Sequence, residues 1–150
     1  MKYLIFWISI LISSQIYSYN PNLLLLGNTE NNGTLLIDIN ANKTIRGLFK
    51  QAIIYEKYIQ PISDRDGFTY QSAIKKLIVD CSGKTIAIRG ENYYLGKTSN
   101  SKLVKSFDDI TLSHDGETGN AFYSFDDLDF KPLDQGKFYN KIFKNTCNLK

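Results

Sequence analysis

The chain has 150 residues, which is the length of a single domain, and its formal net charge is +3. A balance this small does not by itself indicate a nucleic-acid partner, and we expect none. Its two cysteines and one histidine are too few to hold a zinc ion without scattered carboxylates.

Residues 1–18 have the features of a removable export signal. Lys2 provides a short positive start, residues 4–12 form an apolar core, and Ser18 is the cleavage position that we expect. An uncleaved membrane anchor is the alternative, although a spanning helix needs about 20 apolar residues and this run is shorter. We therefore expect residues 19–150 to form one exported domain, periplasmic or at the cell surface, with no transmembrane segment.

Cys81 and Cys147 both lie in the expected mature part. Two cysteines in an exported chain indicate one disulfide, so we expect these residues to be joined. Two buried free thiols are the alternative. No cysteine lies near the end of the apolar leader, so a lipid anchor is not indicated.

The first half of the mature chain is typical of strands and turns. Residues 23–27 and 34–39 are short apolar runs separated by an Asn-Gly turn, which predicts a hairpin. Residues 38–43 favour one helical turn. Residues 44–59 predict a long strand with two mixed faces, for which a helix is the alternative, and we expect Pro61 to end this element.

A second hairpin forms the centre of the predicted sheet. Residues 70–81 and 84–95 are apolar and rich in β-branched side chains, and Gly83 between them is expected to supply the positive φ of a tight turn. Residues 102–107 predict a sixth strand, whose exposed edge would be able to pair with a second copy in a homodimer. Residues 121–125 favour a short edge strand.

The chain is predicted to end in a helix. Pro132 and Asp134 form a start signal, with Asp134 as the N-cap. A single apolar stripe then follows, made of Phe138, Tyr139, Ile142, Phe143 and Cys147. Because Cys147 lies on the stripe, it faces the sheet, as a bond to Cys81 requires.

Charge is segregated along the chain. Residues 74–105 carry seven basic side chains against two acidic ones, whereas residues 108–129 carry seven acidic side chains and no Lys or Arg. On the strand 84–95, Arg89 and Tyr93 share one parity, and Ile86 and Ile88 share the other. A helix over Ile86 and Ile88 would leave Arg89 and Tyr93 pointing outward.

These two residues are the centre of the candidate binding site. The basic side chains expected beside them are Lys97, Lys102 and Lys105. Cationic and aromatic side chains together suit an anionic protein, a sulfated sugar or a phosphate, and we expect a protein. A solubilising surface with no partner is the alternative.

Nothing in the sequence favours catalysis. The motifs of metalloproteases, α/β-hydrolases, phosphate-binding loops and thiol oxidoreductases are absent. The single His114 lies in an acidic, Gly-containing loop, and adjacent carboxylates such as Asp126 and Asp127 diverge in an extended chain. We therefore expect no enzyme, no cofactor and no metal site.

Several of these segments together resemble the surface-adhesin protein E family of Gram-negative bacteria. The similarity covers most of residues 23–147 and is most specific in Val-Asp-Cys at residues 79–81 and in the terminal helix ending at Cys147. The resemblance implies a six-stranded antiparallel sheet with one C-terminal helix tied to it by a Cys81–Cys147 bond. It also implies adhesion, through host extracellular-matrix or plasma proteins. A periplasmic partner-binding or inhibitor-type protein is the alternative, because the lipid signal is missing.

Overall fold

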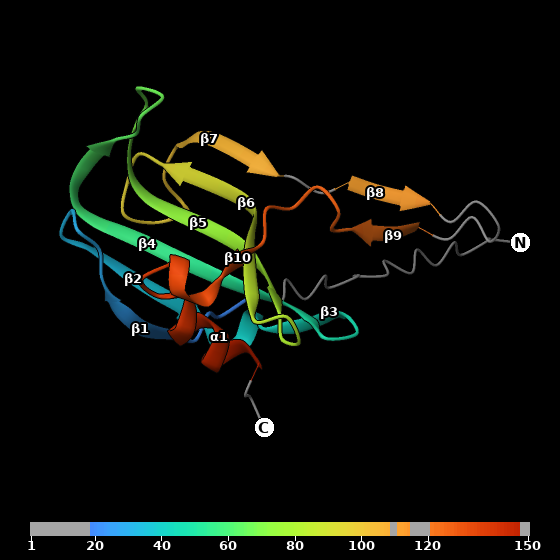
Figure 1. Cartoon of the computed structure of the whole chain (residues 1–150). Coiled ribbons are helices and arrows are strands. Elements are labelled where there is room, and N and C mark those ends of the chain that lie inside the picture. The colour runs from blue at the N-terminus through green and yellow to red at the C-terminus, as the bar shows by residue number, and fades with distance from the viewer. Residues whose placement is uncertain (1–18, 109–110, 115–120, 148–150) are drawn as a thin grey trace, which may run out of the picture.

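The computed structural model describes residues 19–108, 111–114 and 121–147 (Figure 1). This part of the chain forms one eight-stranded antiparallel sheet, a separate two-stranded sheet and a C-terminal α-helix. The predicted fold class, an antiparallel sheet of six strands with a disulfide-linked C-terminal helix on one face, is confirmed, and two short strands are added to it. The expected export signal, residues 1–18, lies outside the described residues.

The six predicted strands correspond to six long or edge strands of the main sheet. They are β1 (Leu23–Asn28), β2 (Gly33–Asp38), β4 (Phe49–Ser63), β5 (Thr69–Asp80), β6 (Thr85–Tyr94) and β7 (Leu103–Asp108). The added strands are β3 (Lys43–Arg46), which pairs with β4, and β10 (Lys131–Pro132), which pairs with β6. The strand order is β1-β2-β4-β5-β6, and β7 and β10 pair with different parts of the remaining side of β6.

The other elements are short. β8 (Thr111–His114) pairs with β9 (Ala121–Ser124), so the expected edge strand at residues 121–125 exists but does not join the main sheet. Two 3₁₀ turns, η1 (Ile39–Ala41) and η2 (Leu133–Gln135), connect larger elements, and η1 is the helical turn expected after β2. The helix α1 (Tyr139–Cys147) closes the described chain.

Three predicted boundaries differ from the observed ones. The run 44–59 is split into β3 and β4 by a turn at Gly47, whose φ is 54°, so the chain reverses where one strand was expected. Pro61 does not end β4, because a register shift between Lys57 and Ile62 accommodates it within the strand. Asp134 lies in η2 and is not the N-cap of α1, which begins five residues later.

The central hairpin reverses as predicted, but its residues play different roles. Lys84, not Gly83, has the positive φ, at 53°. Asp80 accepts hydrogen bonds from the backbone N–H groups of Ser82 (2.9 Å) and Gly83 (3.0 Å) and from the Ser82 hydroxyl (2.6 Å). A Cβ at Gly83 would collide with the Asp80 carboxylate. Glycine is therefore favoured here by this close approach and not by its φ.

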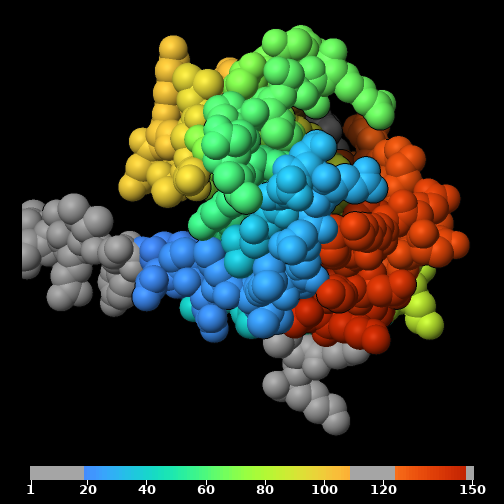
Figure 2. Space-filling model, turned by 90° about the vertical axis from the view of Figure 1, so that its left-hand side faces the viewer, coloured from blue at the N-terminus to red at the C-terminus, as the bar shows by residue number. Residues whose placement is uncertain are grey.

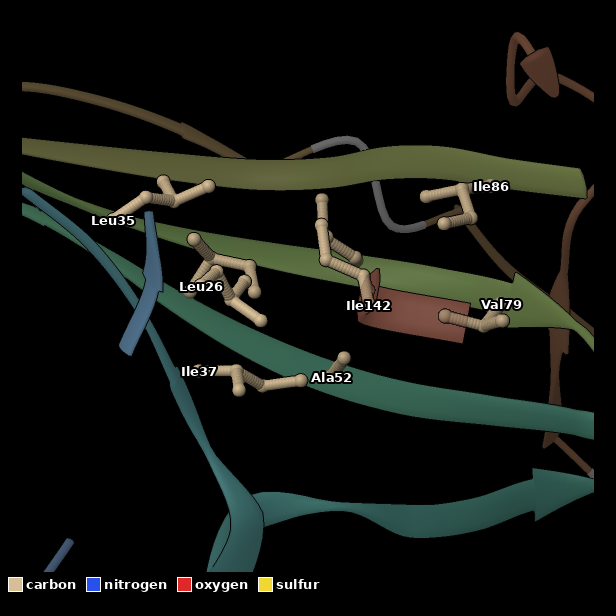
Figure 3. Packing of buried hydrophobic residues seen from close by; sticks show 9 residues of the cluster. Leu26, Leu35, Ile37, Ala52, Val79, Ile86 and Ile142 are labelled. Carbon is tan, nitrogen blue, oxygen red and sulfur yellow. The ribbon is translucent and has the colours of Figure 1, made fainter. Parts of the chain in front are cut away.

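The hydrophobic core lies between α1 and one face of the main sheet, which we call the helix face. Figure 3 shows Ile142 of α1 at the centre of this cluster, surrounded by side chains from the strands. The buried members are Leu26, Leu35, Ile37, Ala52, Ile54, Leu77, Val79, Ile86 and Ile142. The apolar stripe predicted for the helix packs against them, and burial of one such aliphatic side chain stabilises the fold by about 2 kcal/mol.

A disulfide joins Cys81, just after β5, to Cys147 at the end of α1. Their Cα atoms are 5.6 Å apart, and 66 positions separate them in the sequence. This bond confirms the predicted pairing. It anchors the last turn of α1 to the end of β5, close to the core residues that the helix covers.

The β4–β5 hairpin extends well beyond the part of the sheet that α1 covers. Figure 2 shows its tip, in green, bending over at the top, while the C-terminal segment, in red, lies to the right and the β6–β7 connection with β7, in yellow to orange, lies to the left. The helix face thus has one end that α1 covers and a second end, formed by the outer part of this hairpin, that lies beyond the helix.

Candidate functional site

A β-bulge at Arg89 places Arg89 and Tyr93 on opposite faces of the sheet, although simple alternation along the strand predicts one shared face. Ile88 and Gly90 each lie opposite a residue of β5, but Arg89 has no direct partner in that ladder. The inserted residue reverses the alternation of side chains beyond it. Ile88 and Tyr93 lie opposite β5 residues four positions apart, so both belong to the helix face. Tyr93 is buried there, at 7% exposure, instead of pointing outward beside Arg89.

Arg89 lies on the opposite face of the sheet, where its contacts are internal. Its Nη1 donates a hydrogen bond to Gln51 Oε1 (3.3 Å), and its Nε lies 4.0 Å from Asp108 Oδ1. Only 13% of its side chain is exposed. The arginine therefore links β6 to β7 and, across β5, to β4, and it is not presented to a partner.

The three predicted lysines lie around the connection between β6 and β7. Lys97 and Lys102 are exposed. Lys105 lies opposite Tyr93, and its Nζ is 2.8 Å from Asp66 Oδ2 and 4.5 Å from the centre of the Phe107 ring. The structure thus keeps the lysines at one end of the molecule but separates them from Arg89.

Three tyrosines from β4, β5 and β6 pack together on the outer part of the helix face. Tyr70 lies 5.8 Å from Tyr58 and 4.8 Å from Tyr93 between ring centres, both in edge-to-face geometry. Burial raises the pKa of each phenol, and nearby carboxylates add to this, Glu56 for Tyr58 and Tyr70 and Glu91 for Tyr93. These hydroxyls consequently ionise only at a more alkaline pH than an ordinary tyrosine.

Between this aromatic cluster and the core lies an ionic triad, which we define as Glu56, Lys75 and Glu91. Lys75 Nζ is 2.9 Å from Glu56 Oε1 and 3.3 Å from Glu91 Oε1, and the side chains are 22%, 12% and 20% exposed in the order Lys75, Glu56, Glu91. Burial alone would lower the Lys75 pKa, but the two carboxylates together raise it above the usual lysine value. Two carboxylates share one ammonium, so the triad carries one surplus negative charge.

A half-open pocket of about 150 Å³ separates the triad from α1, and we call it the helix–sheet pocket. Its walls are mainly apolar, and three charged side chains border them. The lining residues are Leu35, Ile54, Glu56, Lys75, Leu77, Ile88, Lys137, Phe138, Tyr139 and Ile142. The pocket therefore combines an apolar interior with one charged wall, formed by the Glu56–Lys75 ion pair.

The edge strand β7 is the other surface with the properties of a binding site. Among the described strands it pairs with β6 alone, so its outer edge presents unpaired backbone groups. Leu103 and Phe107 on this strand are 49% and 40% exposed. Exposed apolar side chains and an unpaired edge thus occur together on β7, and the exposed Lys102 comes directly before it.

Comparison of the chain with protein-family models, with curated proteins and with solved structures finds no match. The resemblance to surface-adhesin protein E accordingly stays a prediction. No helix of the described chain is long and apolar enough to cross a membrane. Within the described residues, no group of three or more His, Cys, Asp or Glu side chains gathers in a way that could hold a metal ion. The side chain of His114 lies outside what the structure describes.

Proposed function

We propose that this chain is an exported, non-enzymatic protein-binding module of the surface-adhesin E type. We further propose that it holds an extended segment of its partner along the outer edge of β7. The free edge of β7, with Leu103 and Phe107 exposed on it, is the observation that carries the proposal. A strand added to such an edge gains main-chain hydrogen bonds, and the side chains beside the edge supply selectivity.

The charges beside β7 favour an acidic segment in the partner. Lys97 and Lys102 are exposed near the start of the strand, and Lys105 is already neutralised by Asp66. Exposed lysines attract an acidic chain at long range and lose that attraction as ionic strength rises. Nucleic acid is a poorer fit, because Arg89 faces away from these lysines and is engaged by Gln51.

The disulfide supports the exported location, since such bonds persist in oxidising compartments. Host matrix or plasma proteins are the partners that the family resemblance suggests. A periplasmic partner is the alternative. Protease treatment of whole cells separates the two: digestion of the intact cell surface supports the adhesin role, and protection until the outer membrane is opened supports the periplasmic one.

A pull-down with residues 19–150 as bait, from serum and from periplasmic extract in parallel, tests the binding surface. The test variant is Lys102→Glu with Leu103→Ser. The matched control is Lys43→Glu with Leu48→Ser, which changes one exposed lysine and one exposed leucine around the β3–β4 turn. We expect capture that falls with added salt and is lost in the β7 variant only. Equal capture by both variants would exclude β7, and no capture from either source would contradict the binding role.

The same edge is the place where a second copy would pair. Sedimentation of the wild type and of the β7 variant distinguishes this case. A dimer that dissociates in the β7 variant alone would assign the edge to self-association instead of to a foreign segment.

A further inference from the structure

The helix–sheet pocket has the size and lining of a binding site for a small ligand. It is separate from the edge of β7. A cavity of about 150 Å³ lined by Leu, Ile and Phe side chains is large enough to hold one benzene-sized molecule. Here the apolar lining comes from both sides, with Phe138 and Ile142 on or beside α1 and Leu35 and Ile88 on the strands. The disulfide ties the C-terminal end of the same helix to the sheet.

The wall formed by the Glu56–Lys75 ion pair carries a net negative charge, because Glu91, which does not itself line the pocket, shares the same ammonium. This charge favours a cationic ligand. Glu56 lines the pocket, and its carboxylate accepts from Lys75 through Oε1 (2.9 Å) and from the Tyr58 hydroxyl through Oε2 (3.3 Å). A carboxylate offers about four acceptor positions, so Glu56 has room for a further donor. Glu91 shares the same ammonium, which leaves the triad one negative charge in excess.

Lys137 at the rim opposes this charge only weakly. Its side chain is exposed, and its Nζ lies 5.5 Å from the centre of the Phe138 ring. Within the described chain it forms no ion pair. Water and salt screen an exposed charge much more than a mostly buried one, so the triad dominates the field inside the pocket.

We propose that the helix–sheet pocket binds a small apolar group joined to a positively charged amine. The apolar group enters between α1 and the strands, and the ammonium donates to Glu56 at the charged wall. Free aromatic or aliphatic amines have this chemistry, and so does the N-terminal residue of a protein whose first side chain is apolar. The proposal does not depend on the binding role of β7.

The test uses three probes of nearly equal shape and different charge: 2-phenylethylamine, 2-phenylethanol and phenylacetate. Each is titrated at neutral pH into isotopically labelled residues 19–150, and the backbone amide signals of Leu35, Ile88 and Phe138 are followed by NMR. We expect the amine to bind at least about tenfold more tightly than the alcohol, and phenylacetate to bind most weakly. Absence of shifts with all three probes, or equal affinity for the three, would overturn the proposal.

Variants separate the apolar and the electrostatic parts. Ile88→Trp fills the pocket and should abolish binding of every probe, whereas Ile59→Trp, at an exposed position of β4 away from the pocket, should change nothing. Glu91→Gln removes the surplus charge without altering the pocket wall and should erase the preference for the amine while leaving the alcohol affinity unchanged. Lys137→Gln should strengthen amine binding. An amine preference that survives Glu91→Gln would contradict the role of the triad.

A further pair of probes identifies the source of the ligand. Phe-Gly-Gly amide carries the same ammonium and ring at a chain terminus, and its N-acetylated form lacks the charge. Tighter binding of the free peptide than of 2-phenylethylamine assigns the pocket to a protein N-terminus, and the reverse order assigns it to a small amine. Stronger binding of the acetylated peptide would overturn the proposal.

Discussion

Lys75 and Glu56 form an ion pair of 2.9 Å although they are not direct partners in the β4–β5 ladder. Lys75 lies opposite Ile54, and Glu56 lies opposite Ala73, so the pair runs diagonally across the helix face. Glu91 approaches the same ammonium from β6. Three adjacent strands are thereby connected by charge at the boundary between the apolar core and the tyrosine cluster.

Removal of the Lys75 ammonium, which Glu56 and Glu91 share, should strongly destabilise the fold. Lys75→Met leaves two mostly buried carboxylates side by side, and we expect the free energy of unfolding to fall by about 3 kcal/mol. Lys76→Met is the matched control on the neighbouring residue, whose partner Asp108 is 43% exposed, and it should cost less than about 1 kcal/mol. Urea unfolding of both variants gives the comparison, and equal losses would contradict the structural role of the triad.

The disulfide should contribute more to stability than any single side chain. Its bond closes a loop spanning 66 positions, for which chain entropy gives about 4 kcal/mol. We therefore expect Cys81→Ala with Cys147→Ala to lower the free energy of unfolding by about that amount. The wild type measured in a strong thiol reductant should fall to the same value. A loss below about 1 kcal/mol in both experiments would show that the bond adds little to the packing of α1.

In the turn between β5 and β6, substitutions at two neighbouring residues should change the stability in opposite directions. Gly83→Ala places a Cβ against the Asp80 carboxylate and should destabilise the protein by about 1 kcal/mol or more. Lys84→Gly relieves a positive φ of 53° and should be neutral or stabilising by up to about 1 kcal/mol. Thermal unfolding of the two variants measures both effects. A lower unfolding temperature for Lys84→Gly would contradict the prediction that the backbone at Lys84 is strained.

Stability should decline under alkaline conditions. The folded-state pKa values of Lys75, Tyr58, Tyr70 and Tyr93 are all raised. A raised value means that the stabilisation is complete below the unfolded pKa, about 10 for both residue types, and is lost as pH rises through the folded-state value. We expect the urea midpoint to be constant from about pH 7 to 9 and to fall above about pH 10. Tyr58→Phe with Tyr93→Phe should flatten this decline, and an unchanged slope would exclude the tyrosine contribution.

The predictable parts of the fold are those encoded by local periodicity. The hairpin around Ser82, the apolar stripe of α1 and the pairing of Cys81 with Cys147 all depend on patterns within a few residues or on the cysteine count. The bulge at Arg89 does not, because it adds one residue to β6 without changing the composition of the strand. Gly90 in the strand interior was the available signal, since glycine there often marks a bulge or a close backbone approach.

The candidate site was harder to predict than the fold for a related reason. Glu56, Lys75 and Glu91 come from three strands, and only the register of the sheet brings them together. Read one strand at a time, each is an ordinary charged residue that alternation allows on a solvated face. The placement of Tyr93 on the helix face also required the bulge. Lys97 and Lys102 lie on the short β6–β7 connection and Lys105 on the following strand, as their closeness in the sequence requires.

Intact-mass analysis of the protein recovered from expressing cells, without reduction, tests the central claim most directly. The account predicts an exported species that begins at Tyr19 and is two hydrogens lighter than its fully reduced form, as the Cys81–Cys147 bond requires. Recovery of a chain that still begins at Met1 inside the cell, with both thiols free to react with an alkylating reagent, would contradict it.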